Sequence, residues 1–144
     1  MSRSGFRRGD RQRANALFRT LPAAIRQEVS DALEENAVEL AEAIRRRVPA
    51  DGGDLTASVR WERGKAAQSR GGVQTRAAGA NADLTVRVIE GDDDTFYAGY
   101  VEHGTVNHPA QPHFFPTYRQ LRRQLQARLR RAVTKAIRWK AANP

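Results

Sequence analysis

Three histidines and a glutamate are the residues in this sequence best suited to metal or acid–base chemistry. His103, His108 and His113 are spaced five residues apart, and Glu102 directly precedes the first of them. A folded loop could bring three imidazoles around a metal ion, with the carboxylate as a fourth ligand or as a base. The spacing does not place the histidines on one helix face, and two intervening prolines exclude a regular helix there. A metal-dependent hydrolase is one hypothesis, and loop histidines that hydrogen-bond or pack are the simpler one.

The chain lacks the other motifs on which enzyme chemistry commonly depends. It has no cysteine, which excludes a disulfide framework, a thiolate nucleophile and a cysteine-ligated metal. It also contains no G-x-S-x-G, no H-E-x-x-H and no phosphate-binding glycine loop. The acidic run at 92–94 lacks the remaining ligand spacing of a calcium loop, so we interpret it as a turn. We therefore predict no enzymatic activity, no cofactor and no bound metal.

The net charge of +9 over 144 residues is concentrated at the two ends of the chain. Residues 1–20 carry six arginines and one acidic residue, and 119–144 carry nine basic residues and no acidic one, whereas the region between them is net acidic. Basic ends favour polyanions such as nucleic acid, or acidic surfaces of partner proteins. The candidate contacts with DNA phosphates or with an acidic partner are Arg122, Arg123, Arg130 and Arg131.

No motif that reads a base sequence accompanies these arginines, so any contact with DNA would be non-specific and salt-sensitive. The alternative is that they pair with acidic residues such as Glu34, Glu35 and Glu39, in the same chain or in a neighbouring copy. Non-specific nucleic-acid binding through the basic ends therefore stays open as a second function.

Two long amphipathic helices are predicted from apolar residues that recur every three or four positions. The first covers 21–48, with Thr20 as its N-cap, Pro22 in its first turn and Pro49 directly after it. The second runs from about 116 to 140 and carries arginines on its outer faces. The apolar stripe of the first helix is formed by Ile25, Val29, Leu33, Ala37, Leu40, Ile44 and Val48.

Two short strands are predicted between these helices. Residues 55–62 and 84–89 alternate between apolar and polar side chains, as half-buried strands do. The small, polar segment 63–82 between them is typical of a flexible loop. Residues 96–101 fit a short strand or one helical turn. The whole pattern predicts an α+β fold, with a small antiparallel sheet packed against a long N-terminal helix and a C-terminal amphipathic helix.

The length of the chain predicts one domain, at 20–144, preceded by a flexible basic arm at 1–19 that lacks apolar periodicity. No apolar run approaches the roughly 18–20 residues of a membrane helix. No apolar segment of a secretory signal follows the basic N-terminus. We therefore expect a soluble protein with no membrane partner.

The segment 96–116 is the densest in residues with special properties, with five aromatic residues, three prolines and all three histidines. Prolines fix the backbone and aromatic rings provide large, rigid contact area, so the segment is typical of an interaction surface. We expect at least one of its adjacent phenylalanines to pack in the core instead. The candidate interaction residues are Tyr97, Glu102, His103, Gly104, Thr105, Pro109, Pro112, Phe114 and Phe115.

The same segment resembles the signature of a phage tail-component family, the gene-product-ten type of lambdoid, long-tailed phages. An upstream stretch, in which an apolar-proline pair ends a long helix before the first strand, is similar to the family as well. His113 departs from the pattern, because the family usually has its first phenylalanine there. The matching residues are Tyr97-Ala98, Val101-Glu102, Gly104-Thr105, Pro109-Ala110, Pro112 and Pro116, and upstream Val48-Pro49, Gly53, Leu55 and Ser58-Val59.

The resemblance implies a structural virion protein at the head–tail junction or tail end, of the tail-completion or tail-terminator kind. Such a protein would form a ring, with a hexamer expected, that caps the tail tube and docks to the head connector or stopper. DNA would pass through its lumen. The particle would be a phage or a gene transfer particle, assembled in the host cytoplasm. On this basis we expect Phe114→Ala to cost stability, and Glu102→Ala to leave the protomer folded while impairing assembly.

Overall fold

The computed structural model describes residues 8–49, 53–64, 72–74 and 84–144. The fold is α+β, as predicted, with a small antiparallel sheet. One long helix precedes the strands in the sequence and another follows them. Among the described helices, none contains a stretch long and apolar enough to cross a membrane. The elements in chain order are α1 (Arg8–Thr20), α2 (Ala23–Arg45), α3 (Gly53–Ser58), β1 (Arg60–Arg63), β2 (Val73–Gln74), β3 (Val86–Glu90), α4 (Ala98–His103) and α5 (Phe114–Ala142).

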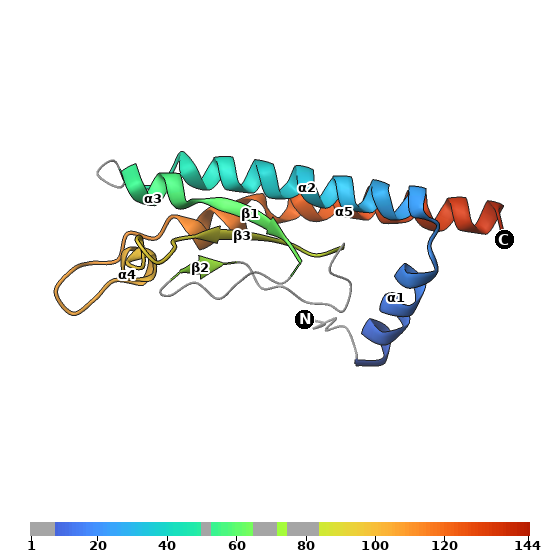
Figure 1. Ribbon diagram of the computed structural model, residues 1–144, viewed down its shortest axis with the longest axis horizontal. Coiled ribbons are helices and arrows are strands. Elements are labelled where there is room, and N and C mark those ends of the chain that lie inside the picture. Colours follow the sequence, from blue (N-terminus) through green and yellow to red (C-terminus); the bar gives the residue numbers. More distant parts are fainter. Residues whose placement is uncertain (1–7, 50–52, 65–71, 75–83) are drawn as a thin grey trace.

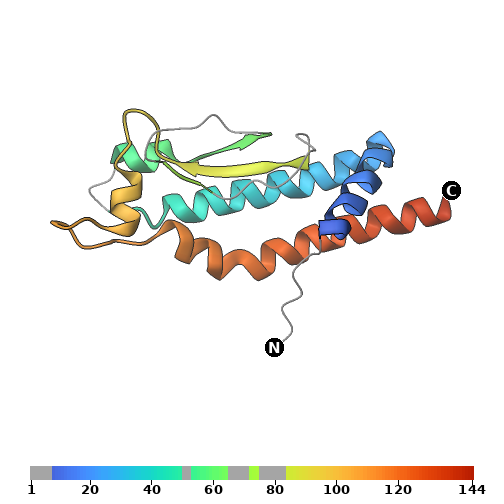
Figure 2. The same cartoon turned by 90° about the horizontal axis from the view of Figure 1, so that it is seen from below.

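The two long helices, α2 and α5, lie side by side and run in opposite directions along the molecule (Figures 1 and 2). The apolar stripe predicted for α2 is its inner face, because Ile25, Val29, Leu40 and Ile44 are all buried. The sheet packs against α2, and the main core lies where the sheet meets the helix pair. Its largest buried members are Leu40, Ile44, Leu55, Val59, Val73, Val88, Phe114 and Leu125.

The sheet has the strand order β1-β3-β2, with both pairs antiparallel. Trp61 of β1 is opposite Val88, and Val73 of β2 is opposite Glu90. The central strand β3 buries three consecutive residues, Val88, Ile89 and Glu90, so both of its faces are covered at this end. The sheet therefore places the side chain of Glu90 inside the protein.

The first predicted strand, 55–62, is wrong over most of its length. Gly53–Ser58 form the short helix α3, and the strand begins only at Arg60. Leu55, Ser58 and Val59 are buried while Ala57 is exposed, and this spacing of three and one matches a helix face rather than a strand. The hydroxyl of Ser58 also donates to the carbonyl oxygen of Leu55 at 2.6 Å, which closes the helical turn.

The N-terminal region also differs from the sequence prediction. In place of a flexible arm throughout 1–19, residues 8–20 form helix α1, while residues 1–7 lie outside the described part. Thr20 does not cap α2: its hydroxyl donates to the carbonyl oxygen of Leu17 at 2.8 Å, and Pro22 occupies the N-cap position. Phe18 packs against the cluster that Ile25 and Val29 form in the first turns of α2, which gives α1 the apolar contact that the sequence pattern did not reveal.

Two further boundaries differ. Within the predicted flexible loop 63–82, Val73–Gln74 form β2, and the stretches 65–71 and 75–83 lie outside the described residues. Of the two possibilities for 96–101, the helical one is correct, since Ala98–His103 form α4. Helix α5 begins at Phe114, two residues before the predicted start at Pro116.

Candidate functional site

Helix α4 and the loop that follows it, residues 104–112, form one end of the molecule (Figure 1). The loop projects beyond the helix pair before the chain enters α5. Val106 in this loop is fully exposed, and Tyr100 of α4 is 58% exposed. Covering such apolar side chains with a partner is favourable, so this end has the character of a contact surface.

The loop starts with a backbone turn that only glycine accommodates. Gly104 has a φ of +77°, and a Cβ atom there would lie 2.7 Å from the backbone nitrogen of Ala110. Any larger residue would meet both the unfavourable backbone region and the neighbouring chain. The N–H of Gly104 donates to the carbonyl oxygen of Tyr100 at 2.8 Å, which ends α4. The glycine in the motif is therefore required for the direction that the loop takes.

Hydrogen bonds then fix the shape of the loop. The hydroxyl oxygen of Thr105 accepts the backbone N–H groups of Asn107 and His108, at 3.3 and 3.1 Å. The N–H of Thr105 donates to the carbonyl oxygen of His108 at 2.9 Å. At the far side of the loop, the N–H of Gln111 donates to the carbonyl oxygen of Val101 at 2.8 Å. A loop held in this way loses little conformational freedom when it binds a partner.

Glu102 joins the base of the loop to the start of α5. Its carboxylate accepts three backbone N–H groups, from His113 at 2.8 Å and from Phe114 and Phe115 at 3.0 Å each. These are donors at the helix start, and the cap at His113 has no side-chain hydrogen bond of its own. Burial by itself raises the pKa of Glu102, but the three N–H groups and the charge of His113 outweigh it and lower the pKa.

His113 is buried between acceptor oxygens. Its Nε2 lies 2.6 Å from Oε1 of Glu90, and its Nδ1 lies 2.9 Å from the carbonyl oxygen of Gln111 and 3.4 Å from Oε2 of Glu102. Burial lowers the pKa of His113, but the hydrogen bonds that its ring makes to Glu90 and to the Gln111 carbonyl oxygen, and the charges of both glutamates, outweigh it and raise the pKa. Both ring nitrogens face acceptors, so the arrangement fits the protonated imidazolium.

Comparison with known proteins identifies the chain at this point. A family model described as "Bacteriophage HK97-gp10, putative tail-component" matches residues 13–104, well over half of the chain. The chain belongs to this phage tail-component family. The match runs from α1 to the glycine that opens the loop. No curated protein and no solved structure was found to match the chain.

The geometry divides the predicted interaction residues of this tail component into two groups. Glu102 and Phe114 are buried. The burial of Phe114 agrees with the expectation that one of the adjacent phenylalanines packs in the core, whereas the burial of Glu102 corrects the expectation that its side chain lies on a contact surface; Glu102 holds the loop and the start of α5 in place. The other group lies at the surface or is half-buried. It consists of Tyr97, His103, Gly104, Thr105, Pro109, Pro112 and Phe115.

Three residues that shape this end of the molecule were not predicted from the sequence. Tyr100 and Val106 are the most exposed apolar side chains of this end, and only the position of Tyr100 three residues after Tyr97 could have indicated a shared surface. Glu90 is fully buried in a strand whose pattern gave no sign that its last residue turns inward. Its Oε2 has no hydrogen-bond partner within the described part of the chain.

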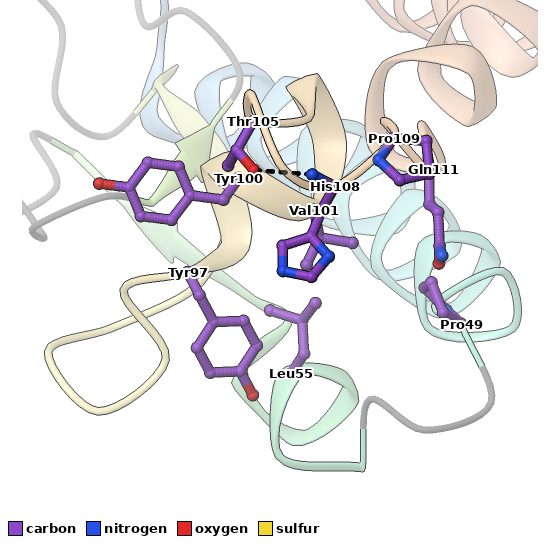
Figure 3. A pocket seen from close by; sticks show the side chains of 9 residues that line it. All are labelled: Pro49, Leu55, Tyr97, Tyr100, Val101, Thr105, His108, Pro109 and Gln111. Atoms are coloured by element: carbon purple, nitrogen blue, oxygen red, sulfur yellow. Dashed lines mark hydrogen bonds between the residues drawn. The ribbon is translucent and has the colours of Figure 1, made fainter.

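A cavity of about 260 Å³ opens between α3, α4 and the loop (Figure 3). Tyr97, Leu55 and His108 point toward its centre in this view, and the hydrogen bond between Thr105 and His108 closes one side. The cavity provides a partly apolar recess directly beside the exposed loop. It is lined by Pro49, Leu55, Tyr97, Tyr100, Val101, Thr105, His108, Pro109 and Gln111.

The structure does not bring the three histidines of this tail component together. His103 and His108 are exposed, whereas His113 is buried and paired with Glu90. Among the residues that the structure describes, no group of three histidine or acidic side chains is arranged to hold a metal ion. The hypothesis of a metal-dependent hydrolase using Glu102 and the histidines therefore has no geometric support.

The candidate basic contacts lie on α5 and are all exposed, at Arg122, Arg123, Arg130 and Arg131. The acidic residues that we considered as their partners bind other cations. Arg128 lies 3.6 Å from Glu35 and 2.6 Å from Glu39, and Glu34 pairs with Arg63.

Proposed function

We propose that this tail component is a structural, non-enzymatic protein of the head–tail junction, of the tail-completion or tail-terminator kind. It forms a ring, with a hexamer expected, that caps the tail tube and joins it to the head connector or stopper, with DNA in the lumen. It acts in the virion of a phage or gene transfer particle after assembly in the host cytoplasm. Membership of the tail-component family is the observation that carries this proposal.

The shape of the loop supports an assembly role. The backbone of residues 104–112 is fixed by hydrogen bonds at both ends, and the buried Glu102 anchors it to α5. Val106 is therefore held in a defined position rather than exposed by a loose segment. A preformed contact surface binds at a lower entropic cost than a loop that must be ordered first.

Light scattering after size-exclusion chromatography tests the proposal, with the protein alone and mixed with the tail-tube protein of its own particle. The wild type should form a ring or a defined complex with the tube. Val106→Asp should reduce binding to the tube or connector while the circular dichroism spectrum is unchanged. Asn107→Asp, which adds the same charge to the neighbouring exposed residue, is the control and should assemble normally. A wild type that remains monomeric and binds no tube under any condition would contradict the proposal.

Non-specific binding of nucleic acid remains a second candidate function, because the four arginines on α5 are exposed. It predicts that duplex DNA of any sequence is retained at low salt and released steeply as the salt concentration rises. An absence of retention at low salt would remove this candidate.

A further inference from the structure

Helix α2 presents an acidic row on its outer surface. Asp31, Glu35, Val38 and Glu42 follow one another at intervals of four, three and four residues, and all four are exposed. This spacing places them on one stripe of the helix, away from the buried stripe. They line a shallow groove of about 600 Å³, together with Glu34, Glu39 and a single cation, Arg128. The groove therefore carries an excess of negative charge around one exposed valine.

Helix α5 presents a basic row, formed by Arg119, Arg123 and Arg130, and Ile137 continues the same stripe. Arg119, Arg123, Arg130 and Ile137 are exposed at intervals of four, seven and seven residues, which again places them on one stripe. The inner face of the same helix is occupied by Leu125 and Ala136, which are buried. The described residues provide no ion pair for these three arginines.

The two rows are complementary in charge and in spacing. The acidic residues 31, 35 and 42 and the basic residues 119, 123 and 130 follow the same intervals of four and seven. Each row spans eleven residues, or about 16 Å of helix at 1.5 Å per residue. Two helices laid in the same direction would therefore place three pairs of opposite charges next to each other, with Glu35 also 3.6 Å from Arg128 of its own chain. Val38 would then be an apolar residue surrounded by these charged pairs, which matches the common arrangement of an apolar interface centre with a polar rim.

We infer that the acidic row of α2 in one copy docks on the basic row of α5 in the next copy. The rows cannot meet within one chain, because α2 and α5 of the same copy already pack in opposite directions through their inner faces. A contact between two different surfaces of identical chains is head-to-tail, and such contacts generate a closed ring when the rotation between successive copies closes. This inference rests on the proposed function and names the protomer contact of the proposed ring.

Charge reversal tests the contact. Asp31→Lys/Glu42→Lys reverses the ends of the acidic row, and Arg119→Glu/Arg130→Glu reverses the ends of the basic row. Either double variant should raise the protein concentration needed for half-maximal assembly by about tenfold or more, because like charges opposed across an interface are strongly unfavourable. Asp93→Lys/Asp94→Lys changes the charge as much as the first variant does, in an exposed turn, and should assemble normally.

Recombination of the variants makes the test specific. An equal mixture of the two double variants should assemble, because each reversed row then meets a row of opposite charge. The two variants would alternate around the ring, which is possible in a ring with an even number of copies. A chain that carries all four substitutions should also assemble by itself. Circular dichroism should show that every variant is folded.

The outcomes separate this inference from the proposed function. Double variants that assemble as well as the wild type would overturn the α2–α5 contact and leave the ring proposal standing. Loss of duplex DNA retention in Arg119→Glu/Arg130→Glu, with assembly intact, would also overturn it and assign the basic row to nucleic acid. A wild type that never assembles, even with the tail tube, would overturn both proposals.

Discussion

Glu102 is the residue whose replacement should most directly damage the end of the protomer that carries the loop. It is 3% exposed, and its carboxylate is the acceptor for three backbone N–H groups at the start of α5. In Glu102→Ala these donors lose their acceptor and His113 loses one of two neighbouring carboxylates. Removing one partner of a buried charged pair costs about 3–5 kcal/mol. We expect the free energy of unfolding to fall by about this amount.

Two comparisons make the Glu102 prediction sharper. Glu102→Gln keeps one acceptor oxygen and loses the charge, so we expect a smaller loss of about 1.5–3 kcal/mol, the value of a hydrogen bond to a charged group. Asp93→Ala, in an exposed turn, should change the free energy of unfolding by less than about 0.5 kcal/mol.

Urea denaturation gives these free energies of unfolding, and hydrogen exchange reports the affected site. The amides of His113, Phe114 and Phe115 should exchange faster in Glu102→Ala, because their N–H groups donate hydrogen bonds to this carboxylate. The reasoning is refuted if Glu102→Ala unfolds at the wild-type urea concentration and the three amides exchange as slowly as before.

Three other predictions concern the same end of the molecule. Phe114→Ala should lower the free energy of unfolding by about 3–5 kcal/mol, since the ring is fully buried, whereas the exposed Phe96→Ala should change urea denaturation little. Gly104→Ala should cost about 1–3 kcal/mol, because a φ of +77° with a ψ of 172° is a backbone conformation that essentially only glycine adopts, and increased hydrogen exchange should be confined largely to the loop. Melting temperatures should be highest between the ordinary pKa values of 4.5 for Glu102 and 6.5 for His113. Because the pKa of His113 is raised in the folded protein, its contribution to the free energy of unfolding is lost as the pH rises above 6.5 through the raised pKa. Because the pKa of Glu102 is lowered in the folded protein, its contribution is lost as the pH falls below 4.5 through the lowered pKa. His113→Gln should abolish the alkaline decline; a decline that persists in that variant would assign it to another group.

The sequence was sufficient to predict α2 and α5 because their apolar residues repeat with the helical period over many turns. Helix α3 was missed because it is only six residues long, and its alternating Leu55, Ala57 and Val59 also fit a strand. Helix α1 was missed because Phe18 provides the apolar contact of a helix that is otherwise mostly polar. Short or weakly packed elements depend on tertiary contacts that periodicity does not record.

The site shows the same limit at the level of single residues. The motif residues were found, but the role of Glu102 was assigned to the surface because a sequence does not show whether a carboxylate is buried. Its N–H donors lie 11 to 13 residues later in the chain. The partner of His113 is Glu90, 23 residues earlier. Only the folded chain brings these groups together, and the result is that the motif builds a rigid loop as well as a surface.

Electron cryomicroscopy of intact particles tests the central claim most directly. The account predicts a closed ring of this chain between the end of the tail tube and the head connector, with the α2 acidic row of each copy against the α5 basic row of the next. The loop 104–112 should contact the tube or the connector through Val106. Particles in which this junction contains no copy of the chain, or in which the chain lies elsewhere as single protomers, would contradict the account.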